Sequence, residues 1–177
     1  MSKIFFIFIM LLSINSSINA QQVNYKNVQL DFSDHWDIQR GQNDELIALQ
    51  QKEKKAFILS IYYPQGIEEG MQYLVSALEV PKQNLMQTEG VKLVRENVEV
   101  KAKDGVIFQA NAFTVNSGKR FLIIASLGSN AGVLLTSYEG QGHNISKALA
   151  EFKVIAESLS LSPPDQGFLF SSDELNP

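Results

Sequence analysis

Between residues 93 and 138 the chain repeats short runs of β-forming residues, joined by turns of only a few residues. Asp104-Gly105 is a hairpin signal, and Asn116-Ser117-Gly118 is a second turn of residues that tolerate left-handed backbone. Parallel strands need a crossover of a dozen or more residues, so connections this short require antiparallel pairing. The sequence therefore predicts antiparallel strands at residues 93–100, 106–115, 120–125 and 132–138, with a third turn at Gly128-Ser129-Asn130.

The first half of the chain is predicted to form further strands, at residues 28–32, 36–38, 45–50 and 56–63. Apolar and polar residues alternate in the first of these runs, as in a strand with one buried face. In the third run, Leu46 and Ala48 are expected to point inward. The fourth run is rich in β-formers and stops at Pro64, which is typical of a central strand because proline cannot pair inside a sheet.

Two stretches change to the helical period. The first has an apolar stripe at helical spacing, ends at Pro81 and is followed by a loop over residues 82–90. The second has its own buried stripe and can be capped by Asn144 or Ser146. The stripe of the first helix is Ile67, Met71, Leu74, Val75 and Leu78, and that of the second is Ile145, Leu149, Phe152, Ile155 and Ala156.

The N-terminal 20 residues have the pattern of an export signal. Lys3 precedes an unbroken apolar run over residues 4–12, and a stretch of small and polar residues ends at Ala20. The apolar run is far shorter than the roughly 20 residues of a membrane-spanning helix, and no later segment is apolar enough to span. We therefore expect cleavage near Ala20 and a periplasmic or extracellular location for the mature protein.

The remaining chain has the length of one domain. We expect a single α+β domain over residues 21–161 and a C-terminal tail over residues 162–177, in which Ser162-Pro163-Pro164 breaks the regular pattern. Phe168-Leu169-Phe170 is an apolar patch in that tail. The sequence leaves open whether this patch docks on the domain or on a partner.

Composition excludes several classes of function. The chain has no cysteine, so it has no disulfide, thiolate metal site or thiol nucleophile. Its formal net charge is −4, and its densest basic run, residues 52–55, is short and interrupted by Glu53. Nucleic-acid binding requires clustered Lys and Arg. We therefore expect no nucleic-acid partner and interpret residues 52–55 as a solvated turn.

Three segments resemble the PsbP/DcrB-like superfamily. Residues 30–36, with Trp36, resemble its opening motif, although Asp34 or His35 stands where the family has proline. Residues 56–64 resemble its central strand, and residues 152–159 its closing helix. The resemblance covers about residues 24–161 and implies an antiparallel β-sheet of about six or seven strands packed between helices. It carries over no catalytic residues, and it implies a binding or scaffolding role.

The two histidines are the first candidates for chemistry. His35 lies among Asp34, Trp36 and Asp37 and is a candidate base or metal ligand, but it has no second histidine at zinc-binding spacing. His143 follows Gly140-Gln141-Gly142, where backbone N–H groups at a helix start can hold an anion. We interpret both as turn residues. The chain also lacks the Gly-x-Ser-x-Gly motif of serine hydrolases, and we predict no catalytic residue, metal or cofactor.

Aromatic residues supply the remaining candidates for ligand or partner binding. Trp36, Tyr62, Tyr63 and Tyr138, together with His143, are the predicted binding residues. Tyr62 and Tyr63 are consecutive in a predicted strand, so one is expected to face the core and the other outward.

The sequence favours an exported, non-enzymatic binding or assembly protein with a protein partner in the cell envelope. One alternative is a carrier of small molecules or lipids, with a pocket between the sheet and the first helix. The other is a small hydrolase-type enzyme that uses His143 or His35 as base. An exposed apolar patch favours protein binding, an enclosed apolar cavity favours the carrier, and a serine or carboxylate beside a histidine favours the enzyme.

Overall fold

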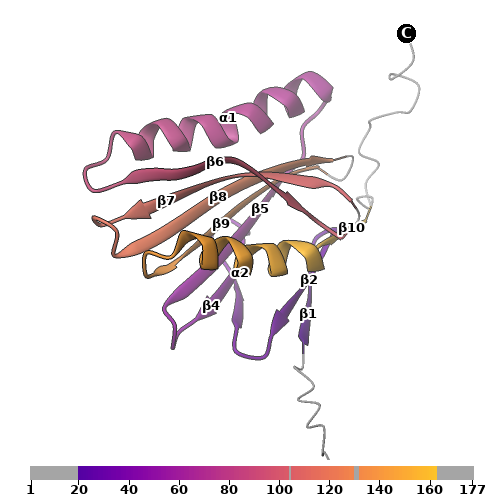
Figure 1. The fold of residues 1–177 in the computed structure, drawn as a ribbon. Helices are drawn as coiled ribbons and strands as arrows, with labels where there is room; N and C mark the ends of the chain where they lie inside the picture. The colour runs from indigo at the N-terminus through magenta and orange to yellow at the C-terminus, as the bar shows by residue number, and fades with distance from the viewer. Residues whose placement is uncertain (1–19, 104, 130–131, 163–177) are drawn as a thin grey trace, which may run out of the picture.

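The computed structural model describes residues 20–103, 105–129 and 132–162. The predicted signal up to residue 19 and the tail from residue 163 lie outside this range, as does Asp104. The described chain folds into two antiparallel sheets and two helices (Figure 1). This confirms the predicted α+β class.

The larger sheet has seven strands in the order β3-β4-β5-β9-β8-β7-β6. Its members are β3 (Asp37–Arg40), β4 (Leu46–Gln50), β5 (Lys55–Tyr62), β6 (Lys92–Lys101), β7 (Ile107–Val115), β8 (Arg120–Ser129) and β9 (Gly132–Gln141). The smaller sheet has the order β1-β2-β10. Its members are β1 (Ala20–Tyr25), β2 (Val28–Ser33) and β10 (Ser160–Leu161).

Two helices cover opposite faces of the seven-stranded sheet (Figure 1). Helix α1 (Ile67–Met86) packs mainly on β8 and β9 and also reaches β6 and β7. Helix α2 (Ile145–Ser158) packs on β6, β7 and β8 from the other side and on β2 of the small sheet. The sheet is thus held between helices, as the resemblance implied.

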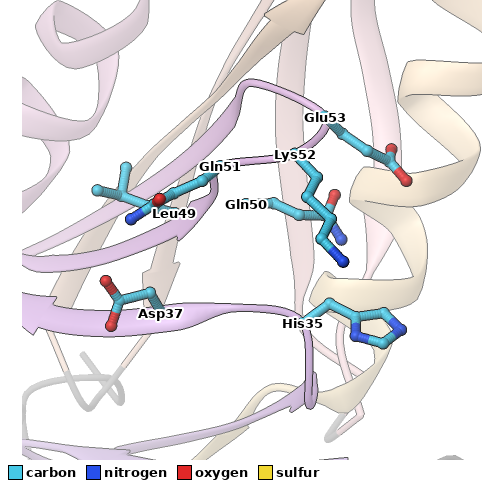
Figure 2. Close-up of a pocket in the computed structure, with 7 residues that line it drawn as sticks. All are labelled: His35, Asp37, Leu49, Gln50, Gln51, Lys52 and Glu53. Carbon is cyan, nitrogen blue, oxygen red and sulfur yellow. The ribbon is translucent and has the colours of Figure 1, made fainter.

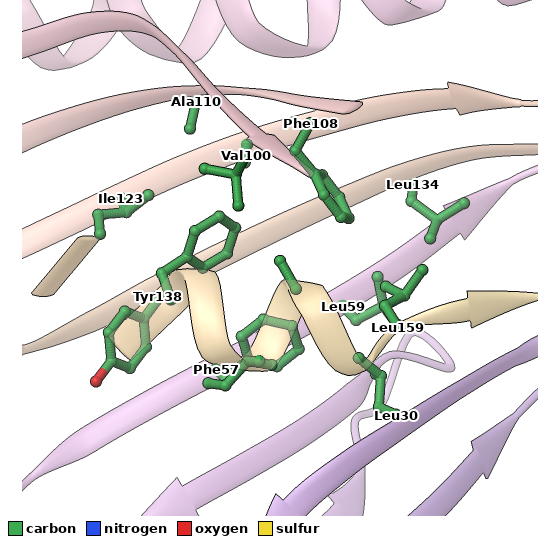
Figure 3. Close-up of a cluster of buried hydrophobic side chains, with 14 of the residues drawn as sticks. Leu30, Phe57, Leu59, Val100, Phe108, Ala110, Ile123, Leu134, Tyr138 and Leu159 are labelled. Atoms are coloured by element: carbon green, nitrogen blue, oxygen red, sulfur yellow. The ribbon is translucent and has the colours of Figure 1, made fainter. Parts of the chain in front are cut away.

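The main core lies between the seven-stranded sheet, α2 and the small sheet (Figure 3). Because side chains alternate along a strand, Phe57 and Leu59 of β5 both point to this side and are fully buried. Phe152 of α2 packs against the rings of Phe57, Phe108 and Tyr138, with centroid distances of 6.5, 6.1 and 6.4 Å. A cysteine-free chain depends on apolar packing of this kind for its stability.

Several local predictions are confirmed. Asn116 and Ser117 both have positive φ, as the primed turn of a β-hairpin requires. The Asn144 side chain accepts a hydrogen bond of 3.0 Å from the backbone N–H of Lys147, so Asn144 rather than Ser146 caps α2. Leu46 and Ala48 are buried. These predictions rested on local chemistry or on alternation along a strand, and in these places the tertiary contacts agree with the local preference.

The predicted end of the first helix is wrong. Helix α1 continues through Pro81 to Met86, so residues 82–86 are helical rather than a loop. Proline removes only one backbone donor, and contacts beyond it hold the last turn. Lys82 forms ion pairs with Glu79 and with Glu96 of β6, and Leu85 is half-buried.

Strand boundaries also differ from prediction. Strand β1 was not predicted, because it is an exposed edge strand with a mainly polar sequence. Strand β8 extends through Gly128-Ser129, where a turn was expected. A Cβ atom on Gly128 would lie 3.0 Å from Leu74 Cδ2, so this glycine permits close approach of α1.

Candidate functional site

Two of the predicted aromatic residues meet beside α2. Trp36 follows the turn after β2, and its ring lies 5.6 Å from the ring of Phe32 and 6.4 Å from that of Tyr138, centroid to centroid. Tyr138, on β9, is buried at 1% exposure, whereas Trp36 is half-buried. Trp36 thus forms the accessible wall of the pair.

These rings border a cleft of about 270 Å³, which we call the Trp36 cleft. Its lining comes from β2 and the turn that follows it, the region of the β4–β5 turn, β9 and α2. It consists of Asp31, Phe32, Ser33, Trp36, Gln50, Glu53, Lys55, Tyr138, Glu151, Val154 and Ile155. The lining combines apolar rings with three carboxylates and one ammonium group. The cleft is therefore suited to a partner group that carries both apolar and polar atoms.

A hydrogen-bonded network lies at the base of this cleft. The Tyr138 hydroxyl donates to Glu151 Oε2 over 2.7 Å, and Lys55 Nζ lies 3.0 Å from the same oxygen. Lys55 also donates to Glu53. The Lys55 side chain is only 10% exposed, so its charge is held by two carboxylates.

Burial and pairing shift the protonation equilibria of this network. Burial disfavours the Lys55 ammonium, but its hydrogen bonds to Glu53 and Glu151 outweigh burial and raise the pKa of Lys55. The hydrogen bond from Lys55 lowers the pKa of Glu53. Burial, aided by Glu151, raises the pKa of the Tyr138 hydroxyl far above its ordinary value. All three shifts stabilise the protonation states that the network already has at neutral pH, as in a structural ion pair.

A second depression adjoins the Trp36 cleft along the β4–β5 turn (Figure 2). We call it the turn groove; it has a volume of about 510 Å³ and is lined by His35, Asp37, Leu49, Gln50, Gln51, Lys52 and Glu53. Figure 2 shows Asp37 and Leu49 on one side of the groove and Glu53 and His35 on the other. Gln50 and Glu53 line both depressions, which therefore form one continuous surface.

His35 has a carboxylate neighbour, as the enzyme alternative required. Its Nδ1 lies 3.2 Å from Asp34 Oδ1, but the side chains of His35 and Asp34 are 74% and 58% exposed. A solvated pair of adjacent residues gives a base little of the preorganisation that catalysis needs. The geometry fits the turn interpretation of His35 better than a catalytic one.

The other predicted site residues lie elsewhere. His143 is exposed at the start of α2 and borders a separate depression of about 360 Å³ with Val94 and Arg95. Tyr62 stacks on Tyr73 of α1, with ring centroids 3.9 Å apart. Tyr63 lies beyond the end of β5 and donates to Asn27 over 2.7 Å. Both side chains are half-buried, but their contacts differ: Tyr62 packs on α1, whereas Tyr63 reaches the turn between β1 and β2.

Helix α1 carries an exposed apolar surface that the sequence did not predict. Met71 and Val75 were expected in the buried stripe, yet each is more than half exposed, as is Met86. Val75 is four residues after Met71, and Met86 is eleven residues after Val75. Both spacings are close to whole numbers of helical turns, so the three residues lie on one flank of the helix. We call Met71, Val75 and Met86 the outer flank of α1. The sequence contained one indication of this surface: the apolar stripe of the helix is wider than the strip of residues that a helix usually buries against a sheet.

The same flank is tied to the edge of the sheet. Lys82 lies between Val75 and Met86 in the helix, and its Nζ is 2.6 Å from Glu79 and 2.9 Å from Glu96 of β6. The outer flank is therefore on the β6 side of α1, away from the Trp36 cleft, which adjoins α2. The protein has two candidate binding surfaces on opposite sides of the large sheet.

No protein-family model matches the chain, and no curated protein matches it. Among solved structures, it is similar to cyanobacterial PsbP (CyanoP) from Synechocystis sp. PCC 6803, with 10% identity and a TM-score of 0.55. That match covers 82% of this chain and 94% of CyanoP. It is also similar to LpqN, involved in cell envelope biogenesis of Mycobacterium tuberculosis, with 12% identity and a TM-score of 0.51. That match covers 81% of this chain and 91% of LpqN.

The protein therefore has the PsbP-like fold, which confirms the resemblance at the level of architecture. No helix in residues 20–162, as far as they are described, is long and apolar enough to cross a membrane. The described residues also contain no group of three or more carboxylate or histidine side chains that could hold a metal ion.

Proposed function

We propose that this protein is exported and acts in the cell envelope by binding another protein, without catalysing a reaction. The observation that carries the proposal is the outer flank of α1. Its three large apolar side chains are each more than half exposed on one helix. Clustered exposure of this kind is typical of interaction sites, whereas single exposed apolar residues are ordinary. Methionine also adapts its shape to a partner at little conformational cost.

Two further observations support the envelope location. Lys3, the apolar run over residues 4–12 and Ala20 form the signal pattern. LpqN, which has the same fold, is described as involved in cell envelope biogenesis. A fold alone does not determine function, so the similarity to LpqN adds to the sequence pattern and does not replace it.

The non-catalytic part of the proposal follows from the Trp36 cleft and the turn groove. The buried network of Lys55, Glu151 and Tyr138 is internally neutralised, and its pKa shifts stabilise the resting charges. A catalytic acid or base needs a pKa brought toward the working pH instead. The network is suited to holding α2 against β5 and β9.

The test is site-specific photocrosslinking in the cell envelope. Benzoylphenylalanine is placed at Val75 on the outer flank or, as the control, at Lys153, an exposed residue of α2 across the sheet that lines neither the Trp36 cleft nor the turn groove. We expect one crosslinked protein from position 75 that is absent from position 153. Crosslinks of equal pattern at both positions, or none at position 75, would contradict the proposal.

The crosslinked protein is then purified and its affinity measured. Met71→Asp places a charge on the outer flank and is expected to weaken binding by about tenfold or more, equivalent to about 1.4 kcal/mol. Lys153→Gln on α2 changes the net charge by the same amount and is the control, which should leave binding unchanged. Tyr63 is not a suitable position for this test, because its hydroxyl donates a hydrogen bond to Asn27 and its loss would disturb the fold.

A further inference from the structure

The Trp36 cleft lies across the sheet from the outer flank of α1, so the proposed partner surface does not include it. Trp36, the only tryptophan of the chain, is half-buried on the turn after β2, and Val154 of α2 is 67% exposed. Phe32 and Ile155 are buried members of the same lining. The cleft thus offers an aromatic ring and aliphatic side chains on which the apolar stem of a ligand can pack.

The charges that line the cleft are mainly negative where solvent reaches them. The lining holds three carboxylates and one ammonium group, a formal charge of −2. The Glu53 and Glu151 side chains are 55% and 31% exposed, whereas that of Lys55 is only 10% exposed. Lys147 also approaches Glu151, at 3.9 Å, but an exposed pair of this kind is weak. The surface that a ligand meets therefore favours a cation.

The carboxylates lie at both ends of the cleft. Asp31 is beside the end of α2, because its backbone bonds to the Ser158 hydroxyl. Glu53 and Glu151 are joined through Lys55. Ser158 is seven residues after Glu151, which is about 10 Å along the helix. A cationic group whose stem lies in the cleft can therefore reach a carboxylate in either direction.

An arginine side chain has both parts of this chemistry. Its stem is apolar, and its planar guanidinium stacks on aromatic rings and donates two parallel hydrogen bonds to a carboxylate. Tryptophan is the aromatic side chain that attracts a cation most strongly. The lysine ammonium is a more strongly hydrated point charge and makes neither the stacked nor the two-pronged contact. The combination of Trp36 with flanking carboxylates therefore favours arginine.

The turn groove gives room for the backbone that would carry such an arginine. Gln50 and Glu53 line both depressions, and Gln51 extends the groove along the β4–β5 turn (Figure 2). An amide side chain both donates and accepts hydrogen bonds, which suits the N–H and C=O groups of an extended chain. The cleft and the groove are open depressions, whereas small-molecule sites enclose most of their ligand. The surface is thus better suited to a peptide than to a small molecule.

We propose that the Trp36 cleft binds an arginine side chain from an extended peptide segment of another protein, and that the peptide backbone continues into the turn groove. The guanidinium stacks on Trp36 and reaches Asp31 or Glu53. This site goes beyond the proposed function, because the outer flank of α1 is on the opposite side of the sheet. The two surfaces can therefore succeed or fail independently.

The single tryptophan reports directly on occupancy of the cleft. The probe is the pentapeptide acetyl-Ala-Val-Arg-Ser-Ala-amide, about 17 Å long when extended. Its matched control carries citrulline in place of arginine, which keeps the shape and removes the charge. We expect the arginine peptide to change the fluorescence of Trp36 saturably, and the citrulline peptide to bind about tenfold more weakly.

Two valine substitutions locate the site. Val154→Lys places a tethered cation in the cleft and should weaken binding of the arginine peptide by about tenfold. Val80→Lys makes the same change at an exposed valine of α1, across the sheet, and should leave the affinity unchanged.

Three results would overturn the proposal: an unchanged Trp36 fluorescence, equal affinity for the two peptides, or equal effects of the two substitutions. Acetyl-arginine amide tests the peptide part of the proposal, because it carries the same side chain without neighbouring residues. We expect it to bind more weakly than the pentapeptide. Equal affinity would assign the cleft to a small cation and overturn the assignment to a peptide.

Discussion

Tyr138 joins a buried ring to a hydroxyl that reaches a partly exposed carboxylate. The ring packs between Trp36, Phe121 and Phe152, and the hydroxyl donates to Glu151. The sequence singled out Tyr138 and Trp36 as separate candidates. It did not indicate Lys55 and Glu151, because these residues are 96 positions apart and only the packing of α2 on the sheet brings them together.

Tyr138→Phe is predicted to lower the free energy of unfolding by about 1–3 kcal/mol, because a hydrogen bond to a charged group is lost in a largely buried position. Urea denaturation at pH 7 measures the change. Tyr62→Phe is the matched control: its hydroxyl also donates to a carboxylate, that of Glu69, but in an exposed setting, so its effect should be clearly smaller. Equal effects of the two substitutions would contradict the role assigned to the buried network.

The Glu53–Lys55 pair predicts a pH dependence of stability. Lys55 lowers the pKa of Glu53 in the folded protein below the ordinary value of 4.5. A carboxyl group with a depressed pKa stabilises the fold above its unfolded pKa, and this contribution is lost as pH falls through the folded value. The raised pKa of Lys55 adds no change in this window, because that group stays protonated far above neutral pH.

Glu53→Gln should therefore be less stable than wild type at pH 7, and the difference should shrink as the pH falls below about 4.5. Thermal unfolding of both proteins across this range is the measurement. Gln51→Asn, in the same turn, is the control because it leaves the charge unchanged; its effect on stability should not vary with pH. If the difference in stability between wild type and Glu53→Gln did not change with pH, the charge of Glu53 would make no contribution to stability, contrary to the prediction.

Among the elements, most strands of the large sheet and α2 follow the sequence, whereas β1, β10 and the exposed flank and end of α1 do not. Alternation predicted β2 and β4, a run of β-forming residues that stops at Pro64 predicted β5, and the stripe beginning at Ile145 predicted α2 with its cap. Periodicity locates the apolar side of a helix, but it does not reveal how much of that side contacts the sheet. Leu74 lies against Gly128 of β8, and Gly70 and Leu78 are buried, whereas Met71 and Val75 are exposed.

Pro81 gives a test of α1 itself. Pro81→Ala restores a backbone donor within the helix and removes a ring that disfavours helical geometry, so it should raise the free energy of unfolding by about 1–3 kcal/mol. Urea denaturation measures this change. Ser76→Ala, an exposed replacement in the same helix, should have a much smaller effect. A loss of stability in Pro81→Ala would mean that the proline ring makes a packing contact that outweighs its cost to the helix.

At the scale of the whole molecule, the domain begins close to the expected end of the signal. Strand β1 starts at Ala20 and pairs with β2 along its full length. Removal of residues 1–20 would leave β1 nearly complete. The expected domain of residues 21–161 therefore remains our proposal for the mature protein, with the tail from residue 162 attached.

We predict that the exported protein begins at Gln21. Intact-mass measurement of the protein recovered from the cell envelope gives the N-terminal residue directly. Replacing Lys3 and interrupting the apolar run with Ile7→Asp should keep the chain in the cytoplasm at its full mass. A protein that retains residues 1–20 outside the cytoplasm, or that begins beyond Tyr25, would contradict the predicted cleavage.

The small sheet unites the two ends of the domain. Strand β2 pairs with β10 near the end of the described chain, and the Ser158 hydroxyl bonds to both backbone groups of Asp31 in β2. Until β10 has left the ribosome, β2 lacks one of its two neighbours. The pairing of β10 with β2 joins distant parts of the sequence, so we expect it to form late in folding. The N-terminal strands therefore cannot complete their sheet until the C-terminal end of the domain has been synthesised.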